Sequence, residues 1–310
     1  MTVAPGCGVV PSTLMPIPGV VIWSYLVAGV VLAVWLVVMV RRGDRARARG
    51  FDKLTLLGPP FYAAPLAAFG AQHFTRTDVI ASIVPVFMPW PRFWTYLVGA
   101  CFVAAGFSLV TGILTRLASR LVALTFFLFV ALMDVPAWID TFLNRFAFAL
   151  ALRELAFSGG ALALAASLTP GVRGAKMTTV ARYFVAIPVV VYGVEQFLHG
   201  TYVPGVPLNR VTPDYVPLRV FWTYLAAVVY VIAGAFLLLG KRTRMAATWV
   251  GATVLLIVLV VYVPIAVVER ASIDTGFNFL ADTLMFGGAV LLLAGAMPRE
   301  SASPSASPAP

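Results

Sequence analysis

The chain has 310 residues, of which 61% are hydrophobic and 11% are charged, and its mean hydropathy is +0.95. Soluble domains carry about a quarter of their residues as charged side chains, so this composition excludes a soluble globular protein and indicates a polytopic membrane protein. The net charge of +10 does not indicate nucleic-acid binding, because the basic residues lie in short tracts between apolar stretches, as in cytoplasmic membrane loops. Cys7 and Cys101 are far apart and match neither a disulfide framework nor a metal-binding spacing.

Runs of roughly 20 apolar residues, long enough to cross a bilayer core of about 30 Å, recur along the chain. The first, at 19–40, is too long for a cleaved signal peptide and no Lys or Arg precedes it, so we expect it to remain as a helix. Further helices are expected at 57–74, 92–114, 118–138, 146–168, 178–199, 219–240, 245–267 and 276–297. The tract from Ser301 to Pro310 contains only Ser, Ala and Pro and is expected to be disordered. The predicted fold is an all-α polytopic membrane protein with about nine transmembrane helices.

The sequence contains an internal repeat. Residues Phe93 to Leu97 recur letter for letter as Phe221 to Leu225, an offset of 128 residues (221 − 93), and the same offset relates many prolines and glycines. We therefore expect two four-helix repeats, 55–170 and 171–298, preceded by an N-terminal helix with a basic loop (1–54) and followed by a tail (299–310). Because each repeat has an even number of helices, the two copies are expected to be parallel, related by an axis along the membrane normal.

The charges between the predicted helices indicate an orientation. One side of the membrane receives 15 of the 22 basic residues, including Arg41, Arg116, Arg173 and Lys241, whereas most acidic residues fall on the other side. The positive-inside rule places the basic side in the cytoplasm. We expect a multi-pass protein of the cell (inner) membrane, with its N-terminus outside and its C-terminus in the cytoplasm.

Two acidic residues lie at equivalent positions inside the membrane. Glu154 and Asp282 (282 − 154 = 128) both fall in the last helix of their repeat. If that helix begins near Arg145, Glu154 lies about 13 Å along it. A carboxyl group at such a depth is unfavourable unless it is protonated, paired or hydrated, and it usually faces the bundle interior or a cavity. We consider both a ligand or proton site and a purely structural contact between helices.

Other polar residues are expected in the same outer half of the membrane. The first helix of each repeat ends in a polar pair, for which interfacial anchoring is the alternative to a functional role. The topology allows these pairs to converge with Glu154 and Asp282. The remaining site candidates are Gln72, His73, Glu195, Gln196, His199, Arg153 and Asp134.

The outer loops are rich in proline and aromatic residues. Proline-dense loops are stiff and poor in backbone donors, and together with aromatic rings they could cover an apolar pocket. The alternative is the aromatic belt found at membrane interfaces in general. The candidates for lining such a pocket are Trp90, Trp94, Trp222, Tyr96 and Tyr224.

The sequence contains no motif for a resident cofactor. The two histidines, His73 and His199, are not repeat equivalents, which disfavours a bis-histidine haem. Patterns for a di-iron bundle, a redox Cys-x-x-Cys and a phosphate-binding glycine-rich loop are all absent from the sequence. We expect no metal and no intrinsic cofactor, and a bound quinone is the one cofactor that we consider.

The repeated pattern resembles the DoxX and DoxX-like family of membrane proteins. It comprises a helix that ends in Gly70 to Phe74, a proline-rich segment, Phe93 to Tyr96, a turn at Gly112 to Arg116, and an acid followed by Gly-Gly-Ala at Glu154 to Ala161. The second copy repeats these features, with Gln196 in place of the histidine. The resemblance covers residues 55–297 and implies tandem four-helix bundles. It also implies a connection to quinones and membrane redox complexes, because the family is linked to quinone-reducing sulfur oxidation.

The leading hypothesis is an accessory membrane component with an outward-facing polar pocket between the repeats. This pocket would bind a hydrophobic molecule such as a quinone, or the protein would dock a redox partner. A second hypothesis is a membrane subunit of a quinone-reducing oxidoreductase, in which a buried acid supplies protons. A third is a small-solute or proton-coupled transporter, and a fourth is a purely structural membrane protein.

Overall fold

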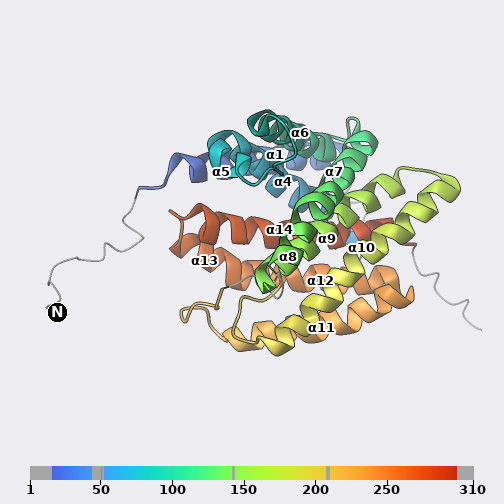
Figure 1. Cartoon of the computed structure of the whole chain (residues 1–310). Coiled ribbons are helices and arrows are strands. Elements are labelled where there is room, and N and C mark those ends of the chain that lie inside the picture. The colour runs from blue at the N-terminus through green and yellow to red at the C-terminus, as the bar shows by residue number, and fades with distance from the viewer. Residues whose placement is uncertain (1–15, 44–49, 51, 142–143, 207–209, 299–310) are drawn as a thin grey trace, which may run out of the picture.

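The computed structural model describes residues 16–43, 50, 52–141, 144–206 and 210–298. Among these residues nine helices are long and apolar enough to cross a membrane, and the only extended pairing is an isolated bridge between Tyr202 and Val211. This confirms the prediction of an all-α polytopic membrane protein (Figure 1). The predicted tail at 299–310 and the basic loop at 44–49 lie outside the described residues.

The spanning helices follow the predicted order along the chain. Their bounds are α1 (Gly19–Arg42), α4 (Gly58–Thr75), α6 (Pro91–Thr111), α7 (Thr115–Phe129) with η2 (Val130–Asp134) and α8 (Val135–Asp140), α9 (Arg145–Ser167), α10 (Gly171–Leu198), α11 (Arg219–Leu239), α12 (Thr243–Ile257) with η3 (Val258–Tyr262) and α13 (Val263–Val268), and η4 (Ile273–Asn278) with α14 (Phe279–Ala296). Two short helices, α3 (Asp52–Thr55) and α5 (Thr77–Ala81), lie in the connections. We refer to 55–170 as the first segment and to 171–298 as the second segment.

Helix α10 begins at Gly171, seven residues before the predicted start (178 − 171). Its first two turns carry the basic residues Arg173 and Lys176, which lower the local hydropathy but are compatible with a helix. Hydropathy marks where a helix enters the bilayer rather than where its hydrogen bonds begin, and this explains the difference.

Two spanning helices contain a π-helical turn followed at once by a proline. η2 directly precedes Val135 and Pro136, and η3 directly precedes Val263 and Pro264. Proline lacks a backbone N–H, and its ring clashes with the carbonyl four residues earlier, so the preceding turn widens. The two π-helical turns are 128 residues apart (258 − 130), which is the offset of the sequence repeat.

The corresponding outer corners of the two segments also share local structure. In each corner the indole N–H of a tryptophan donates to a proline carbonyl five residues earlier: Trp94 to Pro89 at 2.9 Å, and Trp222 to Pro217 at 3.0 Å. In each corner the residue before the helix has a left-handed backbone, with φ of 56° at Trp90 and 53° at Leu218. Equivalent sequence positions therefore adopt equivalent conformations in the two segments.

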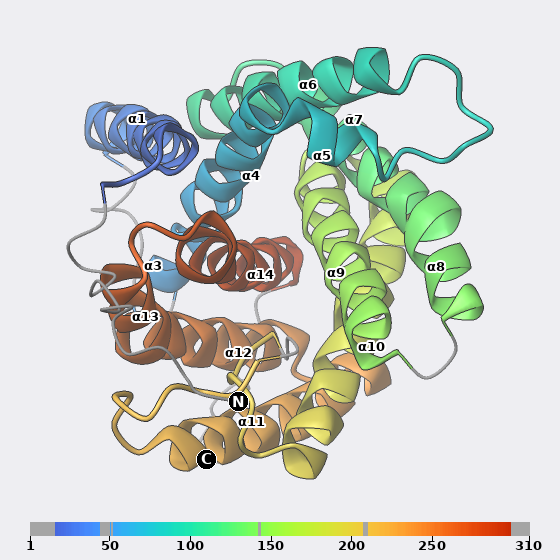
Figure 2. The ribbon, with the colours of Figure 1, turned by 60° about the vertical axis from the view of Figure 1, so that its left-hand side comes forward.

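Helix α14 is the central helix of the bundle and packs against α4, α9 and α12 (Figure 2). Glycines permit this close approach. A Cβ at Gly160 of α9 would lie 2.5 Å from the Cα of Ala289 in α14, and a Cβ at Gly288 of α14 would lie 2.5 Å from the backbone nitrogen of Tyr62 in α4. Because α4 and α9 belong to the first segment and α14 to the second, the two segments share one continuous core.

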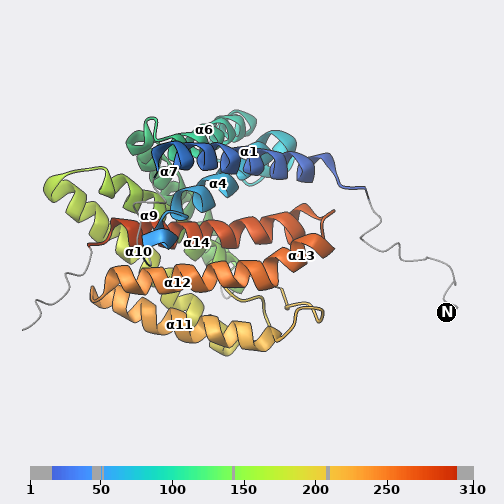
Figure 3. The same cartoon turned by 180° about the vertical axis from the view of Figure 1, so that it is seen from behind.

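Helix α1 lies at the edge of the bundle, against α4 and α6 (Figure 3). Its buried residues are Val21, Ser24 and Val31, so most of its apolar surface is available to lipid.

The two ends of the bundle differ in chemistry. At one end, which we call the basic end, arginines donate to the carbonyl groups of helix C-termini: Arg42 to Thr111 at 2.7 Å, and Arg182 to Leu237 at 2.8 Å. The opposite end, which we call the loop end, carries residues 76–90, 199–206, 210–218 and 269–272.

Candidate functional site

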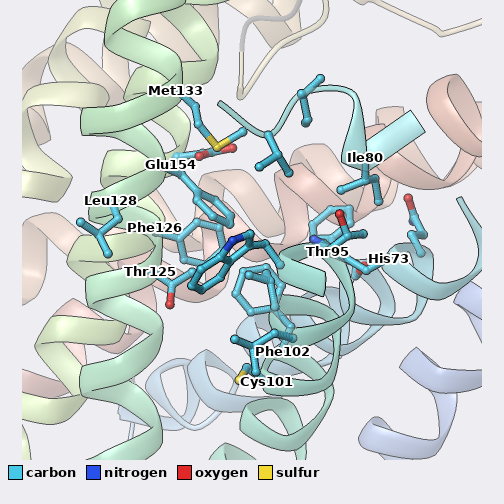
Figure 4. A pocket seen from close by; sticks show the side chains of 18 of the residues that line it. His73, Ile80, Thr95, Cys101, Phe102, Thr125, Phe126, Leu128, Met133 and Glu154 are labelled. Carbon is cyan, nitrogen blue, oxygen red and sulfur yellow. The ribbon is translucent and has the colours of Figure 1, made fainter. Parts of the chain in front are cut away.

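A cavity of about 550 Å³ opens inside the first segment, toward the loop end. Its walls come from α4, α5, α6, α7, η2 and α9, and the second segment contributes Asn278 and Asp282 (Figure 4). The sequence hypothesis put a pocket between the repeats. The described cavity instead lies within the first segment, and the second segment contributes Asn278 and Asp282 to its wall.

Most of the cavity wall is apolar, and one part of it is a cluster of aromatic rings. Phe102 of α6 stacks on Phe126 of α7 with ring centroids 5.2 Å apart, and Phe126 meets Phe157 of α9 edge to face at 5.4 Å. The ring of His73 on α4 lies edge to face with Phe102 at 5.7 Å. Such a wall favours a flat apolar or aromatic ligand, because rings attract one another in stacked and edge-to-face arrangements.

One end of the cavity is ionisable. Arg153 of α9 donates to Asp282 of α14 at 2.7 Å and approaches Glu154 at 3.5 Å. The side chains of Arg153, Glu154 and Asp282 are 14%, 16% and 8% exposed, so this polar group is largely withdrawn from the surface. The two acids predicted to be repeat equivalents therefore border one cavity, and a single guanidinium connects them.

A third acid completes this group. Asp134 of η2 lies near Glu154, so the two carboxyl groups interact electrostatically. A neighbouring negative charge disfavours ionisation of a second carboxyl group, so one proton held by this pair would be favourable. The Oδ2 atom of Asp134 and the Nε atom of Arg153 are buried without a hydrogen-bond partner among the described residues. The ionisable end can therefore hold a proton and retains hydrogen-bonding capacity.

The opposite side of the cavity carries Gln72 and His73 of α4. Gln72 donates to Asn278 of the second segment at 2.8 Å, and Nδ1 of His73 lies 2.8 Å from the carbonyl of Phe69. A carbonyl only accepts, so the contact assigns the proton of a neutral His73 to Nδ1 and leaves Nε2 as an acceptor. His73 and Glu154 line opposite parts of the cavity (Figure 4).

In the second segment the chain itself fills the corresponding space. Residues 203–206, which we call the plug segment, belong to the connection between α10 and α11 and are buried. The counterpart of the cavity residue Phe102 is Tyr230 (230 − 102 = 128), and this residue faces the plug segment: a Cβ at Gly205 would lie 3.9 Å from the Tyr230 hydroxyl oxygen. The second segment therefore has a self-filled version of the cavity.

Two side chains that contact the plug segment correspond, by the repeat offset, to Asp134 and His73 of the first segment. Tyr262, which corresponds to Asp134 (262 − 134 = 128), donates to a carbonyl of the plug segment at 2.7 Å. Gln196, which corresponds to His73 with a shift of 123, accepts from a plug amide at 3.1 Å. Peptide groups in the second segment thus satisfy the positions that border the cavity in the first.

An ion pair outside the spanning helices holds the connection that bears the plug segment. Arg210 donates to Glu269, which follows α13, at 2.8 Å. Burial would raise the pKa of Glu269, but hydrogen bonds from Arg210 and Thr275 and the positive charge of Arg210 outweigh it. The pKa of Glu269 is therefore lowered from its ordinary value.

The remaining polar candidates of the second segment lie away from the cavity. Glu195 pairs with Arg145 at 2.5 Å and lies 3.8 Å from His199, so these groups form a separate cluster where α9 begins and α10 ends, at the loop end. Gln196 faces the plug segment. Glu195, Gln196 and His199, which were predicted to converge with His73 and Glu154, are therefore not brought to the same cavity.

Of the aromatic candidates, Trp94 lines the cavity. Trp90 is 76% exposed and Tyr96 stacks on Phe74 at 5.8 Å on the outer surface. Trp222 and Tyr224 belong to the second segment, where Trp222 packs edge to face with Phe221 at 5.1 Å. None of these last four lines the described cavity.

Sequence reasoning missed several residues that build the site. Phe102, Phe126, Phe129 and Phe157 form its aromatic wall but resemble ordinary core residues in the sequence. Asn278 precedes Asp282 by four residues, the spacing that puts two side chains on one helix face, and this signal could have identified it. No group of three or more His, Cys, Asp or Glu side chains suited to a metal ion occurs among the described residues.

Comparisons with protein-family models, with curated proteins and with solved structures each find no match for this chain.

Proposed function

We propose that the chain is an accessory membrane component that binds a hydrophobic molecule with a ring and a polar head, such as a quinone, in the cavity of the first segment. The observation that carries this proposal is the contrast within one cavity. Apolar side chains with a cluster of aromatic rings form its wall, while Glu154, Arg153 and Asp282 gather at one end and His73 lies at another. Pockets for small ligands combine apolar walls with a few placed polar groups in this way.

The plug segment supports the same ligand chemistry. It presents a peptide carbonyl toward Tyr262 and a peptide amide toward Gln196. A ligand in the first segment would correspondingly bring one polar atom near the Asp134–Glu154 pair and another near His73. A quinone has two carbonyl oxygens on opposite sides of a ring, which matches this arrangement.

We also propose an orientation of the protein in the membrane and a relationship to the DoxX-like family. The basic end would lie in the cytoplasm of an inner membrane, following the positive-inside rule, so the cavity would occupy the outer half of the bilayer. The resemblance to DoxX-like proteins supports a role beside membrane redox complexes, including docking of a redox partner.

The test is binding of decylubiquinone to the purified full chain in mild detergent. The Glu154→Leu variant is expected to bind about two- to tenfold more weakly, because a quinone oxygen only accepts and the protonated carboxyl group of Glu154 would be its donor; a neutral hydrogen bond is worth about 0.5–1.5 kcal/mol. Glu195→Leu is the matched control, because this acid lies in the separate cluster with Arg145. The proposal is wrong if the wild-type chain does not bind the quinone, or if both variants bind as it does.

The carboxyl pair favours a second candidate, a membrane subunit of a quinone-reducing oxidoreductase. Reduction of a quinone to a quinol takes two electrons and two protons. A partner redox protein would supply the electrons, and the Asp134–Glu154 pair would pass protons to the quinone oxygens one at a time. Quinol formation in membranes that contain the chain and its partner, lost in Asp134→Asn while decylubiquinone binding persists, would favour this function over the accessory one.

The tight packing of α9 against α14 disfavours the transporter hypothesis. On the basic-end side of Glu154, α9 approaches α14 so closely that a Cβ at Gly160 would lie 2.5 Å from Ala289. A solute path through the bundle would have to separate these backbones.

A further inference from the structure

The exposed part of the cavity wall has one chemical character. Six residues both line the cavity and are exposed, and all are apolar or weakly polar: Val79, Ile83, Leu97, Cys101, Leu128 and Leu132. The charged and amide-bearing residues of the wall are buried or half-buried. A ligand that arrived from water would meet no polar group at this opening, whereas a ligand dissolved in lipid would leave one apolar environment for another.

Four of these residues lie between two spanning helices. Leu97 and Cys101 are on α6, and Leu128 and Leu132 are on α7 and η2. Cys101 lies ten residues into α6, roughly 15 Å from its outer end, which is near the middle of a bilayer core of about 30 Å. The gap between α6 and α7 therefore faces hydrocarbon rather than the aqueous surface.

The second segment differs at the same place. Its helices α11 and α12 pack against each other more extensively than α6 and α7 do. Leu225, Val229 and Val260, the counterparts of Leu97, Cys101 and Leu132, are only partly exposed. Leu256, the counterpart of Leu128, is as exposed as Leu128 itself. Three of the four gap positions are therefore more covered in the segment that fills its own cavity, so the wider gap accompanies the open cavity of the first segment.

We propose that the cavity is loaded sideways from the bilayer, through the gap between α6 and α7, and that its ligand is a ring-headed lipid whose hydrocarbon chain remains in this gap. This inference rests on the proposed function and specifies its ligand class and route. The ring would enter past Leu97 and Leu128 toward Phe102 and Glu154, while the chain stays among lipid tails.

The experiment compares two probes on the full chain in liposomes. One is a ubiquinone with a long isoprenoid chain, and the other is the same ring with no isoprenoid chain. Leu128→Trp places a large ring in the gap, and Leu256→Trp is the matched control, because Leu256 is the counterpart on α12 and is similarly exposed, at 43% against 42%. We expect Leu128→Trp to weaken or slow binding of the long-chain quinone at least tenfold more than binding of the chainless quinone, and Leu256→Trp to change neither.

The outcomes separate the two proposals. If the wild-type chain binds neither probe, the proposed function is wrong and this inference falls with it. If it binds both, but Leu128→Trp and Leu256→Trp have equal effects on the long-chain probe, the function stands and the lateral route is overturned.

A second measurement tests the gap without a ligand. In the Cys7→Ser variant, a pyrene maleimide on Cys101 should be quenched by lipids carrying a nitroxide near the bilayer centre and not by aqueous iodide. Quenching by iodide alone would place the opening in water and overturn the route.

Discussion

Arg153 and Asp282 face each other at 2.7 Å across the α9–α14 interface and so join the two segments at a largely buried point. The two residues do not occupy equivalent positions of the repeat. The residue that corresponds to Arg153 in the second segment is Ala281 (281 − 153 = 128), so one guanidinium serves the acids of both segments. The ionisable end of the cavity therefore combines groups of the first segment with Asp282 of the second.

Removal of this guanidinium should destabilise the protein strongly. Arg153→Met leaves Asp282, Glu154 and Asp134 without their positive charge, and loss of one partner of a buried ion pair costs about 3–5 kcal/mol. We expect a large drop in the unfolding temperature in detergent. The double variant Arg153→Met/Asp282→Leu is the control and should recover part of the loss. A double variant as unstable as the sum of its single changes would contradict direct pairing.

The plug segment should depend on one tyrosine hydroxyl. Tyr262 donates to a plug carbonyl at 2.7 Å, whereas the hydroxyl of Tyr230 has no hydrogen-bond partner among the described residues. Tyr262→Phe should therefore cost about 1–3 kcal/mol and increase amide hydrogen exchange in residues 203–206, and Tyr230→Phe should change exchange little. Equal exchange in the two variants would show that this bond does not hold the plug segment.

Acid should loosen the connection that carries the plug segment. The pKa of Glu269 is lowered in the folded protein, so the Arg210–Glu269 pair contributes stability that is fully present above the ordinary pKa of 4.5 and is lost as the pH falls through the lower folded value. The protection factors for hydrogen exchange in residues 203–206 should fall on acidification below about pH 4.5 in the wild type. In Glu269→Gln they should already be lower at neutral pH, with a smaller further change on acidification. A pH response unchanged by this substitution would assign it to another group.

The central helix should tolerate a methyl group at one glycine and not at another. A Cβ at Gly288 would lie 2.5 Å from the backbone nitrogen of Tyr62, whereas at Gly295 the nearest neighbour is Cβ of Thr55 at 4.0 Å. Gly288→Ala should destabilise the protein by about 1–3 kcal/mol, since rigid backbone cannot move aside cheaply. Gly295→Ala should be near neutral in the same unfolding assay. Equal unfolding temperatures for the two variants would contradict the α4–α14 packing described above.

The class of fold could be predicted from the sequence. Apolar runs of bilayer length predict spanning helices because no water is available there to bind the backbone, and this reasoning holds whatever the helices pack against. The repeat offset identified Glu154 and Asp282 as a pair for the same reason, since equivalent positions in equivalent helices reach equivalent depths.

The place of the cavity depended on the tertiary structure. The sequence groups Gln196 and Glu195 with His73 and Gln72, yet the longer connection after α10 folds back and buries residues 203–206 against Gln196. Periodicity and hydropathy describe each helix by itself and carry no information on which loop enters a bundle. That choice is made by packing and by hydrogen bonds between residues far apart in the chain, and it leaves one segment filled and the other open.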